Sequence, residues 1–366
     1  MNKKFFMGIA AMAALTLVSC SSDDLDSVSD NSSKNEAISF DGYLGRSAVA
    51  VNGSRGSEVK IDQLKTGGFG VFGNYSKETT TAYGNSLFDN QQVTYDNDKS
   101  KWTYSPLKFW PSDGHIDFLA YAPYNAGTFE NTYHLKFNVS ETITKQKDLL
   151  YAKTVGQTMA KNSGTNKVSF KFNHALSRLG YSVKLNGTCS PDATITLKKI
   201  TLAGSAPEPT TGTTTEPTGA FHKTGTIDLS TGNWTTTSDK QAFKWFSAET
   251  LGSQSITFTS AFNTSTSNKT YTNKDDEYLF VIPQNFSGTN ELYVIVEYTI
   301  QYTGVKGPDG QPATMTNKVY KQLSYNFEQG KAYTINLTIG RPIDFDVNAE
   351  ITPWEKDTTI PEIPMD

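Results

Sequence analysis

Cys20 is the residue whose surroundings most directly indicate chemistry in this 366-residue chain. It follows Leu17-Val18-Ser19, the kind of small-residue segment that precedes the cysteine cut and acylated in bacterial lipoproteins. The preceding apolar run, from Phe5 to Val18, is shorter than the ~18 to 20 residues that a membrane-spanning helix needs. Residues 1–20 are therefore predicted to be a lipoprotein signal peptide, with Cys20 as the lipidation site.

A lipid on Cys20 would place the folded part of the chain at a membrane surface. Two or more acyl chains on one cysteine hold a protein on a bilayer stably, whereas one chain does not. Residues 21–36 are rich in Ser, Asp and Asn and have almost nothing to bury, which predicts a flexible linker. Asp23-Asp24, close behind Cys20, resembles the acidic signal by which Bacteroidetes send lipoproteins to the outer face of the cell, although a solvated linker would look similar. The resemblance implies a chain that is anchored by lipid in the cell outer membrane and exposed at the surface.

The remaining residues that could do chemistry are not arranged for it. The four histidines, His115, His134, His174 and His222, lie in separate stretches without His or Cys at zinc-ligand spacing. The sequence has no Gly-x-Ser-x-Gly elbow, no Walker loop and no dinucleotide fingerprint. No enzyme activity, metal or cofactor is expected. For His174 we favour a histidine that fixes a strand bend through a backbone hydrogen bond over a catalytic one.

Composition predicts an all-β protein that does not bind nucleic acid. The net charge is −4 and basic clusters are missing, which argues against nucleic acid as a partner. Apolar residues alternate with polar ones from Ile38 onward, and Gly, Asn, Asp and Pro turns recur about every ten residues. Both features are typical of sandwiches and barrels. The length remaining after the leader suggests two domains.

The predicted organisation follows these patterns. The domain boundary is placed in the Gly/Ser/Asn stretch at 162–166, which gives an N-terminal domain over 37–165 and a C-terminal domain over 166–366. Predicted strands are Ala37–Leu44, Gly68–Tyr75, Ile116–Tyr121, Tyr133–Val139, Val168–Phe172, Leu179–Leu185, Thr194–Leu202, Ser255–Phe262, Tyr278–Ile282, Glu291–Tyr302, Tyr320–Phe327 and Tyr333–Ile339.

Eight short patterns occur in order along nearly all of the mature chain. They are Gly68-Phe69-Gly70-Val71-Phe72, Trp102-Thr103-Tyr104 with Phe109-Trp110-Pro111, Ile116-Asp117-Phe118-Leu119-Ala120-Tyr121-Ala122-Pro123, Asp148-Leu149-Leu150-Tyr151-Ala152, Phe172-Asn173-His174-Ala175-Leu176, Leu279-Phe280-Val281-Ile282-Pro283, Gly330-Lys331-Ala332-Tyr333 and Thr352-Pro353-Trp354. Together they resemble the fimbrillin family of Bacteroidetes, including the Mfa-like proteins of type V pili. The resemblance implies two tandem transthyretin-like β-sandwich domains.

The resemblance also implies how the chain would mature. Type V pilins travel as lipoproteins and are then cut after an arginine by a trypsin-like protease, which removes the lipid with the first strand and leaves an open groove. Here that strand would be Ala37–Leu44, and Arg46 and Arg55 lie in the small-residue segment after it. Arg55 matches the placement in the family better than Arg46 does. Two ordinary loop arginines are the alternative.

An open groove would need a strand to fill it. Ile343, Phe345, Val347, Ala349 and Ile351 alternate with polar residues and give one apolar face near the C-terminus. This segment is a candidate donor strand for the groove of a neighbouring subunit, and head-to-tail insertion of this kind does not close, so it yields a filament. The other interpretation, that it is the last strand of its own domain, stays open.

The sequence therefore predicts a fimbrial subunit, or a lipoprotein associated with fimbriae, that serves adhesion or biofilm formation. Its predicted partners are other fimbrial subunits, an arginine-specific protease, the outer membrane through the lipid, and ligands on host or bacterial surfaces. The alternative is a surface lipoprotein that keeps its lipid, does not polymerise and binds a glycan or a protein. Retention of the N-terminal strand in the mature protein would favour that alternative.

Overall fold

The computed structural model describes residues 36–44, 59–162, 167–185, 193–205, 217–247, 256–259, 271–272, 278–288, 291–339 and 345–353. Strands dominate this part of the chain, so the predicted all-β fold is confirmed. The helical elements described are short: α1 (Ile61–Gly67), α2 (Met159–Asn162) and the 3-10 turn η1 (Ile143–Lys145). Helix α1 was not predicted because it is too short to show a helical period, and it buries only Leu64.

A seven-stranded sheet collects most of the strands between residues 39 and 174. All neighbouring strands in it are antiparallel except β1 and β9, which are parallel. In spatial order the strands are β1 (Ser39–Leu44), β9 (Lys167–His174), β8 (Leu150–Gln157), β5 (His115–Ala122), β2 (Phe69–Ser76), β3 (Phe88–Asp96) and β4 (Lys101–Thr103). The two end strands, β1 and β4, contact each other, so the sheet curls around one core.

Strand β5 separates two hydrophobic clusters. Its residues Ile116 and Phe118 belong to the cluster enclosed by the seven-stranded sheet, which we call the upper core. Leu119 and Tyr121 point the other way, into a larger cluster that we call the main core. Side chains of a strand alternate between faces, so a strand buried on both faces needs apolar residues at nearly every position. This explains why every residue of β5 after His115 is buried, and why all of them except Asp117 are apolar or aromatic.

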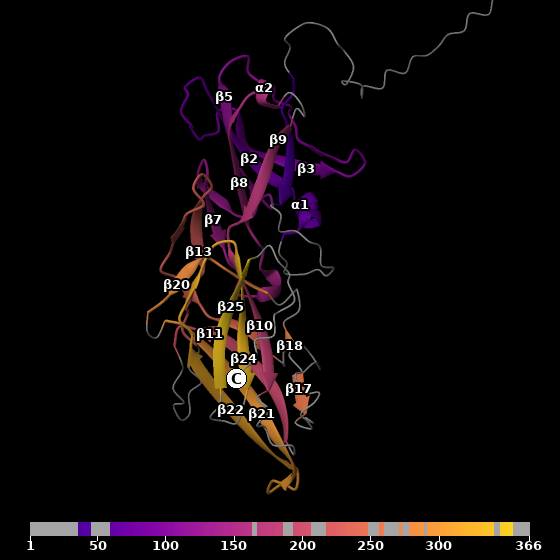
Figure 1. Ribbon diagram of the computed structural model, residues 1–366, viewed down its shortest axis with the longest axis vertical. Coiled ribbons are helices and arrows are strands. Elements are labelled where there is room, and N and C mark those ends of the chain that lie inside the picture. Colours follow the sequence, from indigo (N-terminus) through magenta and orange to yellow (C-terminus); the bar gives the residue numbers. More distant parts are fainter. Residues whose placement is uncertain are drawn as a thin grey trace, which may run out of the picture. The chain divides into compact units, whose positions relative to one another are not determined.

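The main core is covered by strands from the rest of the chain. One sheet contains β18 (Tyr271–Thr272), β10 (Ser177–Leu185), β24 (Lys331–Ile339) and β25 (Phe345–Pro353), with β19 (Leu279–Val281) also on β10; a second contains β16 (Phe243–Ser247), β11 (Ala193–Ala203), β21 (Tyr293–Lys306) and β22 (Pro312–Gln322), with β17 (Ile256–Thr259) also on β11. Both sheets supply buried residues to the main core. Figure 1 shows β10, β24 and β25 running beside one another.

Three smaller sheets complete the described part of the fold. A four-stranded sheet has the order β14 (Trp234–Thr236), β13 (Thr224–Asp228), β7 (His134–Asn138) and β6 (Thr128–Asn131), and the two pairs are β12 (Phe221–His222) with β15 (Lys240–Gln241) and β20 (Gln284–Phe286) with β23 (Tyr325–Phe327). The predicted strand Tyr320–Phe327 is wrong as one element, because it divides between β22 and β23 in different sheets.

Strand pairing crosses the predicted domain boundary in both directions. Strand β9 follows residue 165 but pairs with β1 and β8 of the seven-stranded sheet. Strand β7 precedes residue 165 but pairs with β13. All described residues belong to one compact unit, Glu36–Asp366. The division into two tandem sandwich domains at 165 stays a prediction.

One of the short sequence patterns owes its glycine to a close approach. Gly70 on β2 pairs with Tyr121 on β5, and a Cβ at Gly70 would overlap the Tyr121 ring. The Tyr121 hydroxyl donates to Asn90 Oδ1 at 2.8 Å, and burial raises the pKa of this tyrosine to about 12. The ring therefore lies in a fixed, largely dry position directly over the glycine.

We predict that Gly70→Ala lowers the free energy of unfolding by about 1 to 3 kcal/mol, because the added methyl must displace a packed ring. Chemical denaturation followed by fluorescence measures the change. Gly307→Ala is the control: its nearest neighbour would be Oδ1 of Asp309, 3.0 Å away, an exposed atom that accepts one hydrogen bond from Gln311 N. A shift of this exposed side chain by a few tenths of an ångström relieves the contact, so we expect a change within about 0.5 kcal/mol. Equal effects of the two substitutions would contradict the packing argument.

Candidate strand-exchange site

Strand β1 is a separate edge piece laid against the upper core. On one side it pairs with β9 in a parallel register that matches Phe40 with Val168 and Leu44 with Phe172. On its other side the segment before it is held by the chain after β4: Ile38 N donates to Lys108 O at 2.8 Å, and Trp110 N donates to Glu36 O at 3.0 Å. Strand β1 is therefore held along one edge by β9, and the residues just before it are held by the chain after β4.

Phe40 is the main anchor of β1. Its ring is 2% exposed and lies 5.3 to 5.7 Å from four other rings, those of Phe88, Tyr104, Phe118 and Phe170. These four residues form what we call the ring socket. They come from β3, from the turn after β4, from β5 and from β9, so one side chain of β1 contacts four parts of the sheet. Edge-to-face ring pairs add about 0.5 to 1.5 kcal/mol each to the gain from burial.

The inward positions of β1 differ in the space they offer. Ile38 and Phe40 are buried, and Gly42 is buried as well. A Cβ added at Gly42 would lie 3.3 Å from the ring edges of both Phe69 and Phe172. The site thus accepts a large residue, then an aromatic ring, and then a residue with almost no side chain. The outward residues Asp41 and Tyr43 are exposed.

Tyr104 also fixes the backbone at the start of β1. Its hydroxyl donates to Ile38 O at 2.6 Å, and Lys108 N donates to the same hydroxyl at 3.3 Å. Burial raises the pKa of Tyr104 above its usual value, so the hydroxyl keeps its proton at neutral pH and remains a donor. One residue of the ring socket therefore contacts both the side chain of Phe40 and the backbone of Ile38.

Strand β25 lies at the edge of its own sheet. It pairs antiparallel with β24, in a register that sets Phe345 opposite Ile339 and Val347 opposite Leu337. Ala349 and Ile351 of the predicted donor strand lie further along the same strand, while Ile343 lies outside the described residues. The structure thus places this segment as a strand of its own chain. A second role as a donor to a neighbour stays a prediction.

The predicted lipidation and processing residues fall elsewhere. Cys20, Arg46 and Arg55 all lie outside the described residues. The next described residue after Leu44 is Val59, which follows Arg55 closely in the sequence. The two ends of the segment that carries both arginines, Leu44 and Val59, therefore both belong to described structure.

The buried carboxylate of Asp148 binds the backbone at Val59. The Asp148 side chain is fully buried, and its oxygens accept hydrogen bonds from Val59 N at 3.0 Å and Leu149 N at 2.8 Å. His174 Nδ1 lies 2.7 Å from Asp148 Oδ2. No sequence pattern predicts this group: a backbone hydrogen bond is expected for His174, and the partner that the structure shows is the Asp148 carboxylate. Asp148 and His174 each stand in one of the eight patterns, but nothing in the sequence pairs them.

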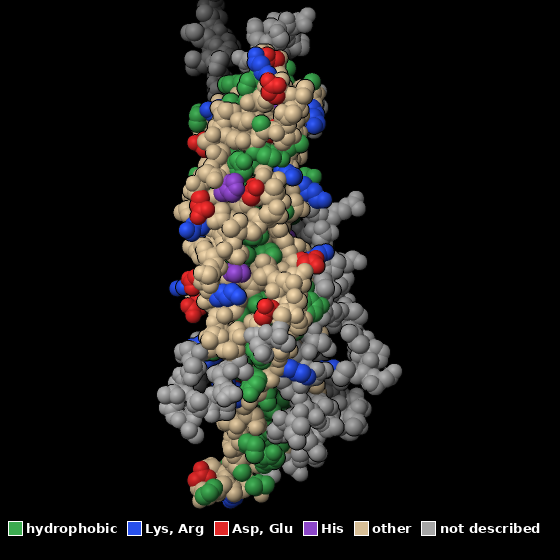
Figure 2. Space-filling model, turned by 90° about the vertical axis from the view of Figure 1, so that its left-hand side faces the viewer, with side chains coloured by type: hydrophobic (Ala, Val, Ile, Leu, Met, Phe, Trp, Pro, Cys, Tyr) green, Lys and Arg blue, Asp and Glu red, His purple; other side chains and the backbone are tan. Residues whose placement is uncertain are grey.

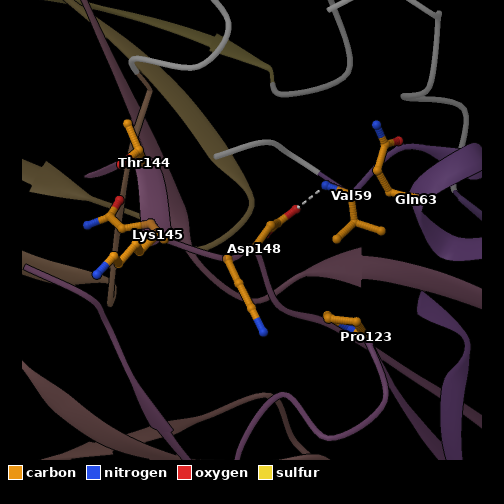
Figure 3. Close-up of a pocket in the computed structure, with 8 residues that line it drawn as sticks. Val59, Gln63, Pro123, Thr144, Lys145 and Asp148 are labelled. Atoms are coloured by element: carbon orange, nitrogen blue, oxygen red, sulfur yellow. Dashed lines mark hydrogen bonds between the residues drawn. The ribbon is translucent and has the colours of Figure 1, made fainter. Parts of the chain in front are cut away.

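An open pocket of about 440 Å³ adjoins this carboxylate (Figure 3). Its lining includes Gln63, Lys145, Gln146 and Lys147. Both polar groups of the Gln146 side chain already bind the backbone of this protein: Nε2 donates to Ser140 O at 2.9 Å, and Oε1 accepts from Phe280 N at 2.7 Å. The pocket combines two lysines with a carboxylate that is already hydrogen-bonded, and the residues that line it include no Ser, Cys or His nucleophile.

Among the described residues, no three His, Cys, Asp or Glu side chains gather as a metal ion would require. None of the helices they form has the length and apolar character needed to cross a bilayer. Figure 2 shows one face of the molecule, where acidic and basic side chains are interspersed and not gathered by sign.

Comparisons with known proteins agree with this architecture. The sequence model of the fimbrillin-like family matches residues 59–354. A fimbrial protein from Bacteroides vulgatus ATCC 8482 has a similar structure, with a TM-score of 0.64 and 21% identity over 88% of this chain and 100% of its own. A protein assigned to cell adhesion from Bacteroides ovatus ATCC 8483 gives a TM-score of 0.47 and 16% identity over 88% of this chain and 98% of its own. The curated proteins include no match.

The family match spans most of the chain. It begins at Val59, whose backbone N–H donates to Asp148, and ends at Trp354, the residue after β25. The chain belongs to the fimbrillin-like family. Membership in this family supports a fimbrial role at the cell surface. The solved fimbrial structure, at 21% identity, supports the fold.

We predict that Phe40→Ala lowers the free energy of unfolding by about 3 to 5 kcal/mol, because it empties the ring socket. Tyr43→Ala is the matched control on the same strand, since Tyr43 is 47% exposed, and we expect a change within about 0.5 kcal/mol. Denaturant titration measures both. A small effect of Phe40→Ala would show that β1 contributes little to the upper core.

We also predict that Asp148→Ala destabilises the protein by about 1 to 3 kcal/mol for each buried donor left without a partner, and that protease sensitivity increases near Val59. Asp148→Asn keeps one acceptor oxygen and should lose less. The control is Asp113→Asn, which removes an exposed pair with Lys77 and should leave stability nearly unchanged. Limited proteolysis with mass spectrometry locates the opened segment, and cleavage elsewhere first would contradict the assignment.

Proposed function

We propose that this protein is a fimbrial subunit, or a lipoprotein associated with fimbriae, that assembles when β1 is removed and the strand of a neighbour replaces it. The observation that carries the proposal is the position of β1. It is an edge strand, its connection to the rest of the chain runs through the segment that contains Arg46 and Arg55, and it nevertheless supplies Ile38 and Phe40 to the upper core.

Removal of β1 would leave a defined acceptor. The ring socket and the outer edge of β9 would lose their cover together. Each well-buried large apolar side chain contributes about 1.5 to 3 kcal/mol, and each hydrogen bond of a strand ladder about 0.5 to 1.5 kcal/mol. A replacement strand recovers both terms, which is the energetic basis of strand addition at a sheet edge.

Strand β25 is the proposed donor. It is the last described strand, it pairs on one side only, and the chain continues after it for residues 354–366. Insertion into the next subunit uses different surfaces on donor and acceptor, so the contact repeats without closing and forms a filament. An arginine-specific protease and the outer membrane, through the lipid on Cys20, are the proposed partners during maturation.

We predict that Arg55→Ala leaves the lipid and β1 on protein recovered from the cell surface, whereas wild type begins at Gly56 without lipid. Arg46→Ala is the control and should mature normally. N-terminal sequencing and mass spectrometry of lipid on surface protein measure the outcome. A lipidated Cys20 start in wild type would contradict processing and favour the lipoprotein that keeps its anchor and binds a glycan or protein.

A further inference from the structure

Strand β1 and the segment that leads into β25 carry the same short sequence. Ile38-Ser39-Phe40-Asp41 and Ile343-Asp344-Phe345-Asp346 share Ile, Phe and Asp at the first, third and fourth positions. The shared apolar residues are those that β1 buries, and the shared Asp is exposed at Asp41. The match therefore covers both faces of the strand: two residues that fill the acceptor site and one that faces water.

When the two segments are aligned on these residues, the next two inward positions differ in side-chain size, and the two differences are opposite. Gly42 corresponds to Val347, and Leu44 corresponds to Ala349. The two pairs contain the same total number of side-chain carbons, moved by two positions along the same face. Phe172 links the positions: it pairs with Leu44 in register, and its ring edge bounds the space at Gly42. A smaller residue opposite Phe172 gives its ring room to move away from a valine.

We propose that β25 of a second copy enters the β1 site in the direction and register of β1, with Phe345 in the ring socket and Ile343 in the place of Ile38. This inference rests on the proposed function and makes it specific. The ring socket then selects the register of the incoming strand, because a shift by two residues would offer Val347 to a space built for an aromatic ring.

The register predicts which residues face each other between subunits. In β1, Asp41 pairs with Ser169 and Tyr43 pairs with Lys171, and all four residues are exposed. Asp346 of the donor should therefore lie opposite Ser169 of the acceptor, and Asn348 opposite Lys171. Ser169 and Lys171 accept cysteine without disturbing the core, because both are exposed.

The test is disulfide formation between subunits in the full chain, with Cys189→Ser as background. Two double variants are in register, Asp346→Cys with Ser169→Cys and Asn348→Cys with Lys171→Cys. The two crossed combinations shift the register by two residues. Mismatched Cα atoms would then lie about 8 Å apart, because two residues advance a strand by about 6.6 Å and strands lie about 4.8 Å apart. A disulfide requires less than about 7 Å.

After processing and mild oxidation, the in-register variants should give cross-linked ladders on nonreducing gels, on the order of tenfold more than the crossed variants. Unprocessed chains should stay monomeric, because β1 fills the site. Polymers that cross-link only in the crossed combinations, or in none, would overturn the register while strand exchange stands. Processed chains that form no polymer would overturn strand exchange and the register together.

A second measurement tests the ring socket without assembly. Gly42→Val in the unprocessed chain should lower the midpoint of thermal unfolding, and adding Leu44→Ala should recover part of the loss, since neighbouring substitutions at one cavity couple. The double variant gives β1 the inward residues of β25. If Leu44→Ala instead adds its own loss to that of Gly42→Val, the compensation, and with it the proposed fit of β25, is wrong.

Discussion

The upper core is completed by Phe40, a side chain delivered by an edge strand and enclosed by rings from four parts of the sheet. A curled sheet must cover its enclosed face, and here β1 covers the opening between β9 and the chain that follows β4. Other features are arranged around this contact. Gly42 leaves room for the rings of Phe69 and Phe172, and Tyr104 holds the backbone next to the buried ring.

Strand β5 connects this region to the rest of the fold. Because it is apolar on both faces, it shares its side chains between the upper core and the main core. Buried carboxylates stabilise the chain at the ends of β5 and β8. Asp117 accepts hydrogen bonds from Ala82 N and Gly156 N, and Asp148 accepts from Val59 N. Fully hydrogen-bonded carboxylates of this kind fix loops in one conformation, since an unpaired buried donor is costly.

Much of this architecture follows from local sequence patterns. The parts that do not follow from them escape prediction for physical reasons. Alternating residues predict β1, β7, β9 and β24, and the family resemblance leads to the correct fold class. Pairing across the chain is not local information, so the placement of β9 beside β1 and of β7 beside β13 is invisible to periodicity. The Asp148 and His174 contact, like the ring socket, joins residues far apart in sequence. Cys20, Arg46 and Arg55 depend on sequence motifs alone and lie outside the described residues.

Strand β1 pairs with residues far along the chain: Ser39, for example, lies opposite Lys167. It therefore binds the sheet as a separate peptide would, except that a covalent tether connects the two. While the tether is intact, β1 binds at an effective concentration on the order of millimolar. A single cut in segment 45–58 breaks none of the described contacts of β1, yet it turns this intramolecular equilibrium into one that depends on dilution. Connectivity, and not the strength of the packing, would then decide whether the sheet keeps its first strand.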